Sequence, residues 1–292
     1  MYEKTSTIDR SAEDKTLDTE SRLNGLKLPS HIKSSRDPSN LVPGHALLLL
    51  SDSALPLGSF AYSSGLESYL AHAKLRPSST NSMSAFLSFL SLSIASTAST
   101  SLPYLLAAYR HPEVLETIDN DMDAATTCIV AQRASVSQGR ALLGVWARAF
   151  RQAYEPAPDR GSSATERAKQ ALEGIFEALQ GSDGTGEELG AKGHFAPLWG
   201  TVCLAMGLAE QQATYVFMVN HAKAVLSAAV RASVMGPYRA QSILASQSLQ
   251  DMILERIERE CEMSMEQAGQ VVPLLDLWLG RHELLYSRIF NS

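Results

Sequence analysis

The chain has 292 residues, of which 45% are hydrophobic, and a formal net charge of −6 with a sequence pI near 5.7. The apolar content is ample for a buried core, and the acidic balance argues against a surface that neutralises phosphate groups, so nucleic acid is excluded as an expected partner. Three cysteines, Cys128, Cys203 and Cys261, are an odd number and lie far apart. They predict no disulfide framework and fit a reducing cytoplasm best.

The first 40 residues are rich in Ser, Thr, Asp, Glu and Lys and carry few large apolar side chains. Such a segment cannot bury enough surface to offset the entropy of ordering, so we expect residues 1–40 to be a disordered polar tail. It lacks the apolar stretch of a secretory signal, and nothing marks the chain for export. We expect one domain over residues 41–292.

The segment Leu48 to Leu70, LLLSDSALPLGSFAYSSGLESYL, predicts a junction between two helices. Pro56 disfavours helix in the residue before it and Gly58 adds backbone freedom, so a helix from about His45 should stop before Pro56. Ser64 followed three residues later by Glu67 has the form of a capping box, which predicts that a second helix begins there. Tyr62 on this turn has two open interpretations: an exposed contact residue, or a buried ring that packs two helices together.

Serine and threonine are unusually frequent from Ser78 to Ser101, where a helix would ordinarily carry Lys and Glu at its polar positions. One interpretation is an interior helix whose hydroxyls bond back to the preceding turn. The other is a surface that a partner covers.

Helical spacing dominates the rest of the chain, and no alternating strand pattern competes with it. Two apolar stripes are expected to face the core: Phe86, Leu90 and Ile94, and then Ile129, Val136, Leu143, Trp146 and Phe150. Connections or kinks are expected at Pro103, Pro112, Pro237 and Pro273, with the Gly236-Pro237 pair as the surest helix end. Residues 156–193 form a polar insertion that is partly loop. Two loop-like stretches of it flank one predicted surface helix, TERAKQALEGIFEALQ. The fold class predicted is an all-α, single-domain helical bundle.

Motifs for catalysis, metal binding and membrane insertion are weak or missing. No GxxxxGK[ST] or HExxH occurs, and Ser63 and Ser64 are not framed as GxSxG. Asp119, Asp121 and Asp123 imitate the start of a calcium loop without its glycine and glutamate, so we interpret them as helix-start carboxylates. The apolar run 195–209 is shorter than the roughly 20 residues of a membrane span and is interpreted as a core helix. We expect no catalytic, cofactor or metal site.

The C-terminal segment places charges on an apolar stripe. Leu274, Trp278, Leu285 and Ile289 share one predicted helix face, onto which Arg281 and Arg288 also project. Either each guanidinium pairs with a carboxylate inside the fold, such as Glu283, or the segment is a docking surface.

Four blocks of sequence together resemble the nickel-urease accessory protein family UreF. The PxGxxxYSxGLE pattern appears as Pro56, Gly58, Tyr62, Ser63, Gly65, Leu66 and Glu67. HFAPLWGTVCLAMGL from His194 and NHAKAVLSAAVRASVMGP from Asn220 are similar to the family's middle helices. The family's RHExxYSRxFxS ending appears as Arg281, His282, Glu283, Tyr286, Ser287, Arg288, Phe290 and Ser292. The resemblance runs from about Leu47 to the last residue, and it departs at the polar N-terminal extension and at a long insertion.

This resemblance implies a helical, usually dimeric adaptor without chemistry of its own and without a cofactor. Such an adaptor joins the UreD/UreH accessory protein to the GTPase UreG on the way to urease apoprotein, and helps deliver nickel, which transits through the complex. It also implies that the Pro56 to Glu67 junction and the Arg281 to Ser292 tail contact UreD/UreH, while the dimer exposes a second surface to UreG. The implied partner-binding residues are Pro56, Gly58, Tyr62, Ser63, Glu67, Arg281, His282, Glu283, Tyr286, Arg288 and Phe290.

Two rival functions stay open: a helical scaffold dimer unrelated to nickel, and an all-α enzyme whose site assembles from distant residues. An enzyme should show a pocket with several convergent titratable groups, whereas an adaptor should expose apolar patches near the two named segments.

Overall fold

A computed structural model describes residues 44–73, 82–154, 163–181 and 190–291 of the chain. Within those residues every regular element is helical, which confirms the predicted all-α class. The α-helices are α2 (His45–Ser51), α3 (Leu66–Ala73), α4 (Ser82–Arg110), α5 (Leu115–Ala125), α6 (Ile129–Val145), α7 (Ser163–Gly181), α8 (Phe195–Ala205), α9 (Glu210–Arg231), α10 (Pro237–Leu244), α11 (Gln247–Glu260) and α12 (Pro273–Arg281). Residues 46–292 form one compact unit. The predicted 1–40 tail and much of the 156–193 insertion lie outside the described residues.

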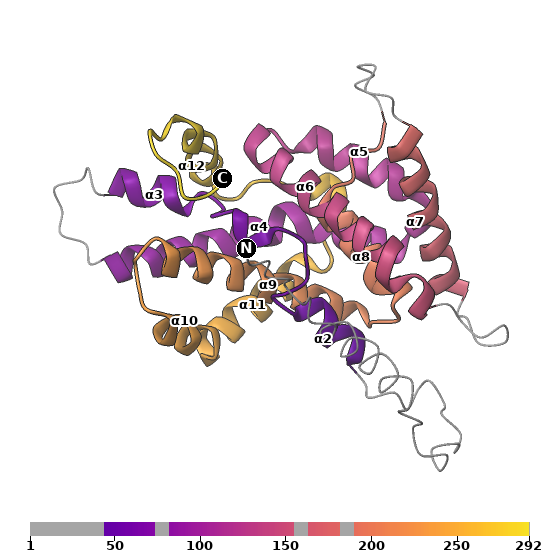
Figure 1. Ribbon diagram of the computed structural model, residues 1–292, viewed down its shortest axis with the longest axis horizontal. Coiled ribbons are helices and arrows are strands. Elements are labelled where there is room, and N and C mark those ends of the chain that lie inside the picture. The colour runs from indigo at the N-terminus through magenta and orange to yellow at the C-terminus, as the bar shows by residue number, and fades with distance from the viewer. Residues whose placement is uncertain (1–43, 74–81, 155–162, 182–189, 292) are drawn as a thin grey trace, which may run out of the picture. The chain divides into compact units, whose positions relative to one another are not determined.

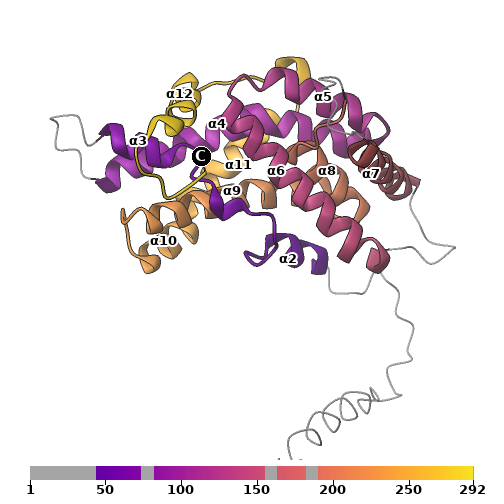
Figure 2. The same cartoon turned by 45° about the horizontal axis from the view of Figure 1, so that its top comes forward.

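Helix α4 is the centre of this unit and packs against α8, α9 and α11 (Figures 1 and 2). Phe86, Leu90 and Ile94 are buried in it, which confirms their predicted stripe. Pro103 lies inside α4 without ending it, so of the connection or kink expected there the connection is absent. Among the described residues α4 alone is long and apolar enough to cross a membrane, and 56% of its most apolar window is already buried by other helices. That burial is typical of a core helix.

Helix α8 is the second core element and contacts α4, α6, α7 and α9. Leu198, Trp199 and Val202 are fully buried, which confirms the interpretation of this apolar run as a core helix. Gly200 lies against the backbone of α4, where an added Cβ would overlap the carbonyl oxygen of Leu105. The two helices therefore approach more closely than any larger residue at this position would permit.

Three local expectations were wrong. The predicted helix in the insertion is α7, but it packs on α8 with Leu172 and Ile175 buried, so it belongs to the core and is not simply a surface helix. Ile129 is 62% exposed because it is the first residue of α6, where the chain has only just entered the bundle. A connection does precede Pro237, but the Gly236-Pro237 pair does not end a helix: α9 ends at Arg231, and Pro237 begins α10 six residues later, which fits the preference of proline for the first helical turn.

The C-terminal stripe is the largest correction. Helix α12 ends at Arg281, a single 3-10 turn covers His282–Leu284, and the chain then continues without helix. Because the helical repeat stops, a spacing of seven residues no longer places Arg281 and Arg288 on one helix face.

Candidate functional site

The junction and the C-terminal tail, more than 200 residues apart in sequence, meet where α3 packs on α12. A Cβ on Gly65 would stand 3.4 Å from Leu279, so the start of α3 lies in direct contact with α12. The Tyr69 ring then contacts Phe89 of α4 in a tilted arrangement and Trp278 of α12 edge-on, with centroid distances of 5.1 and 4.6 Å. This aromatic cluster fixes α12 to the bundle. The ribbons of α3 and α12 lie side by side (Figures 1 and 2).

The cap of α3 differs from the predicted capping box. Ser64 has a positive φ of 53°, which is outside the extended region that an N-cap residue adopts. Its neighbour Ser63 serves instead, because its hydroxyl accepts a hydrogen bond from the Glu67 amide at 3.3 Å. The Glu67 carboxylate is thereby left free for other donors.

Those donors all come from the tail. Glu67 Oε2 accepts hydrogen bonds from His282 Nε2 at 2.9 Å and from the Phe290 amide at 3.2 Å, and Oε1 accepts one from the Ile289 amide at 2.8 Å. One residue further on, the Asn291 amide donates to the carbonyl of Ala61 at 2.8 Å. The Phe290 ring is buried, and the guanidinium of Arg231 lies 4.4 Å from its centroid, within the range of a cation–π contact.

Helix α12 and the tail expose several large apolar side chains. Leu274, Leu277 and Ile289 are each more than half exposed, Leu284 is 78% exposed and Tyr286 is fully exposed. We call these five residues the tail strip. A group of large apolar side chains left in water is typical of an interaction surface, whereas one exposed leucine would signify nothing.

Arginines border the tail strip. Arg281 and Arg288 are exposed, and neither makes an ion pair with any carboxylate among the described residues. Glu283, the internal partner that one interpretation gave them, pairs with Arg133 of α6 instead. Among the described residues, the structure therefore does not contain the internal ion pairs that one of the two alternatives gave to these guanidinium groups.

The predicted partner-binding residues divide by exposure. Those that reach the surface are Pro56, Gly58, Arg281, Glu283, Tyr286 and Arg288. Tyr62 is half-buried, and those that point inward are Ser63, His282, Phe290 and, for most of its surface, Glu67. The two segments are thus brought together as one site, but only part of each is available for contact.

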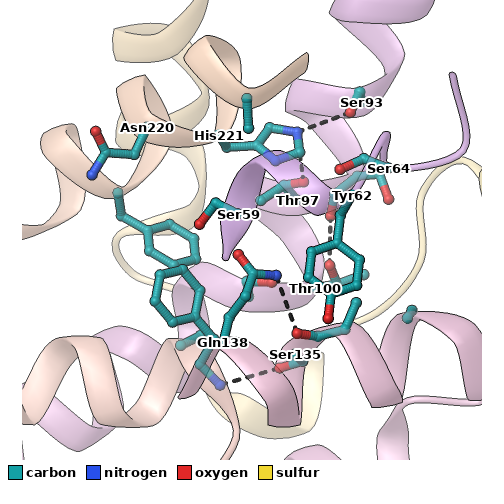
Figure 3. Close-up of a pocket in the computed structure, with 18 of the residues that line it drawn as sticks. Ser59, Tyr62, Ser64, Ser93, Thr97, Thr100, Ser135, Gln138, Asn220 and His221 are labelled. Atoms are coloured by element: carbon teal, nitrogen blue, oxygen red, sulfur yellow. Dashed lines mark hydrogen bonds between the residues drawn. The ribbon is translucent and has the colours of Figure 1, made fainter. Parts of the chain in front are cut away.

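A cavity of about 280 Å³ lies beneath the junction, between the Ser59–Ala61 turn and helices α4, α6 and α9 (Figure 3). Tyr62 lines it, and hydroxyl groups cover much of its α4 wall. Ser93 Oγ and Thr97 Oγ1 lie 2.9 and 3.1 Å from Nε2 of His221, as Figure 3 shows. Burial lowers the pKa of His221 from 6.5 to about 4, so this imidazole is neutral near pH 7.

From Ser93 to Ser101 the hydroxyl-rich stretch of α4 is interior, as the first of its two interpretations held. Its earlier serines Ser82, Ser84 and Ser88 are exposed, and residues 78–81 lie outside the described residues. Ser99 and Thr100 both donate to the carbonyl of Ser96, at 3.1 and 2.8 Å, within the preceding turn. Sequence reasoning missed the hydrogen bonds of Ser93 and Thr97, because both hydroxyls bond to His221, which is more than 120 residues away in sequence.

The interpretation of Asp119 and Asp123 as helix-start carboxylates was wrong about which helix they serve. Asp119 is the fifth and Asp123 the ninth of the eleven residues of α5, so neither lies in its first turn. Asp119 is fully buried and accepts hydrogen bonds from the amides of Lys192, Gly193 and His194, at 2.6, 2.9 and 2.5 Å. Since α8 begins at Phe195, this carboxylate caps a helix more than 70 residues downstream.

A carboxylate, an imidazole and a hydroxyl follow one another at the same place. Asp123 Oδ1 is 2.9 Å from His194 Nε2, and His194 Nδ1 is 3.0 Å from Ser135 Oγ. The order is that of a hydrolase triad, but Ser135 Oγ also accepts the Phe195 amide at 3.2 Å, and the imidazole is fully buried. The chain of bonds fastens α8 to α5 and α6, and it does not present an activated nucleophile. Among the described residues no cluster of three or more His, Cys, Asp or Glu side chains has metal-binding geometry.

Comparisons with known proteins point to the same family that the sequence blocks resemble. The family model UreF matches residues 81–248, which is more than half of the chain. An uncharacterised urease accessory protein UreF-like from Schizosaccharomyces pombe is 37% identical over 248 residues, covering 85% of this chain and 97% of that protein. Urease accessory protein F from Oryza sativa subsp. indica is 28% identical over 281 residues, covering 92% and 95%. Urease accessory protein F from Arabidopsis thaliana is 29% identical over 250 residues, covering 83% and 90%.

Proposed function

Since the chain belongs to the UreF family of urease accessory proteins, we propose that it is a non-catalytic adaptor that joins UreD/UreH to the GTPase UreG. The family's role is the maturation of urease, and in the proposal this chain serves the step in which nickel reaches the metallocentre of the apoprotein. Nickel is then cargo that passes through the assembled complex, and the adaptor works in the cytoplasm as a homodimer.

The observation that carries the proposal is the joint surface of the junction and the tail. Two segments that are remote in sequence are held together by Glu67, and outside them lies the tail strip with its bordering arginines. Exposed aromatic and aliphatic side chains next to arginine form the usual centre of a protein interface. UreD/UreH is the partner that we assign to this surface.

The mechanism is one of binding energy. An adaptor that binds one nucleotide state of UreG more tightly than another couples GTP hydrolysis to nickel release, and only such a difference in affinity can do so. No residue of this chain then needs to contact GTP. The alternative of an all-α enzyme would rest on Asp123, His194 and Ser135, whose hydrogen bonds are already used to start α8.

Two tyrosines that are both highly exposed give a matched test of the assigned surface. Tyr286 lies in the tail strip and Tyr238 lies on α10, and both are more than 90% exposed. We expect Tyr286→Ala to weaken binding to UreD/UreH by about tenfold or more, as loss of an interface anchor does, and Tyr238→Ala to change it less than about twofold. The dissociation constants of the purified full-length variants decide the matter. Equal affinities for all three proteins would contradict the proposal, and a helical scaffold unrelated to nickel would not bind UreD/UreH at all.

A further inference from the structure

We propose that Glu67 is a positioning residue that shapes the docking surface from within, without contacting the partner itself. This inference rests on the proposed function of the surface. It differs from the role implied by the sequence resemblance, in which Glu67 is itself a partner contact. The side chain of Glu67 is only 13% exposed, and its carboxylate accepts bonds from three donors of the tail.

The three donors bracket a loop. His282 stands at one end of residues 283–288, and the amides of Ile289 and Phe290 stand at the other. A single carboxylate therefore closes this six-residue loop at both ends, and Leu284 and Tyr286 of the tail strip lie on it. Hydrogen bonds to an ionised carboxylate are stronger than hydrogen bonds between two neutral groups. The closure therefore restricts the conformations of the loop more than hydrogen bonds to water would.

The same bonds decide which side chains face outward. Because the consecutive amides of Ile289 and Phe290 both point at Glu67, the backbone there is fixed in orientation. Phe290 is then directed inward beneath Arg231, and Ile289 is left 63% exposed as part of the tail strip. A surface whose side chains are already oriented loses less conformational entropy on binding, and this raises the affinity for a partner without adding any contact.

We call the three hydrogen bonds from the tail to the Glu67 carboxylate the clasp. The clasp can be broken without unfolding the protein, so a positioning role of Glu67 can be told apart from a role in overall stability. Between residues 283 and 291 only Phe290 is buried, so the tail contributes little to the core. The helix that carries the tail is held independently, by the contact of Tyr69 with Trp278. Loss of the clasp should therefore release the tail and leave the helices in place.

Glu67→Gln removes the clasp with the smallest change of shape. A glutamine has one acceptor oxygen, and its NH₂ group would face donors that now bond to the second oxygen. We expect this variant to bind UreD/UreH about tenfold more weakly or worse, and to lose hydrogen-exchange protection at the amides of residues 289 and 290. Its helix content should match the wild type. Glu255→Gln on α11 is the control, because it makes the same exchange in an exposed pair with Arg259.

A cross-link separates positioning from any direct role of the carboxylate. The bond between Asn291 and Ala61 brings the two backbones close enough to test a cysteine pair at these positions. In the variant Glu67→Gln/Ala61→Cys/Asn291→Cys, we expect the oxidised form to recover most of the affinity for UreD/UreH and the reduced form to stay weak.

The outcomes distinguish this inference from the proposed function on which it rests. A wild-type chain that does not bind UreD/UreH overturns the proposed function, and the inference with it. Wild type and Glu67→Gln that bind equally well overturn the inference alone. So does a loss of binding that the cross-link fails to restore, or one that is accompanied by an equal loss of helix content.

Discussion

Replacement of Asp119 by alanine should be among the most destabilising single changes in the chain. Its carboxylate is fully buried and bonds to three successive amides ahead of α8, a helix that lies in the middle of the core. Without that carboxylate, the amides of Gly193 and His194 would stay buried with no acceptor, whereas the amide of Lys192 is only partly buried.

The size of the loss follows from those two buried amides. A buried donor left without an acceptor costs about 1–3 kcal/mol, so the pair predicts a loss of about 2–6 kcal/mol. Domains of this kind are stable by about 5–15 kcal/mol, which makes the expected loss a large part of the total. Asp119→Asn keeps one acceptor oxygen and should lose less than the alanine variant.

Urea unfolding followed by far-ultraviolet circular dichroism measures the effect. Asp121→Ala is the matched control, since Asp121 lies on the same helix and is exposed, and it should change the free energy of unfolding by less than about 0.5 kcal/mol. A loss of under about 1 kcal/mol for Asp119→Ala would refute the reasoning that this carboxylate caps α8 across the fold.

Three further predictions concern packing, pH and thiol chemistry. Gly200→Ala should destabilise the folded protein by about 2 kcal/mol or more, because the added Cβ would overlap the Leu105 carbonyl. Gly174→Ala, on an open face of α7, should instead stabilise it by about 0.5–1 kcal/mol. Thermal or urea unfolding compares the two variants. Burial lowers the pKa of His221 from 6.5 to about 4, so on acidification this imidazole is protonated in the unfolded chain before it is protonated in the folded one. The free energy of unfolding should therefore fall by about 3 kcal/mol as the pH drops from 6.5 to 4. Urea unfolding across that range should show a smaller fall for His221→Gln. Burial raises the pKa of the Cys203 thiol, so a thiol reagent should label the native protein at Cys128 and Cys261 well before Cys203, and equal rates would contradict this.

The helices could be predicted from the sequence because their signals are local. Phe86, Leu90 and Ile94 recur at helical spacing, and the core lies on the side to which they point. Helical spacing gives the wrong burial for Ile129, because the periodicity of an apolar stripe does not reveal where the helix begins relative to the core.

The candidate site could be predicted only in part, because its contacts are long-range. Ser64 and Glu67 have the spacing of a capping box, but Glu67 is taken by tail donors that no local pattern reveals. Asp119 likewise lies near the middle of one helix and caps another. The resemblance of both ends of the chain to one family placed the junction and the tail in a single functional unit, and the structure brings them into contact.

The measurement that tests the adaptor account most directly is co-purification of this chain with UreD/UreH and UreG from its own organism. The intact protein is compared with a form truncated before Arg281, and circular dichroism reports the helix content of each. The account predicts a complex with the intact chain that is lost on truncation, while the helices persist. A complex that survives truncation, or no complex with either form, would contradict it.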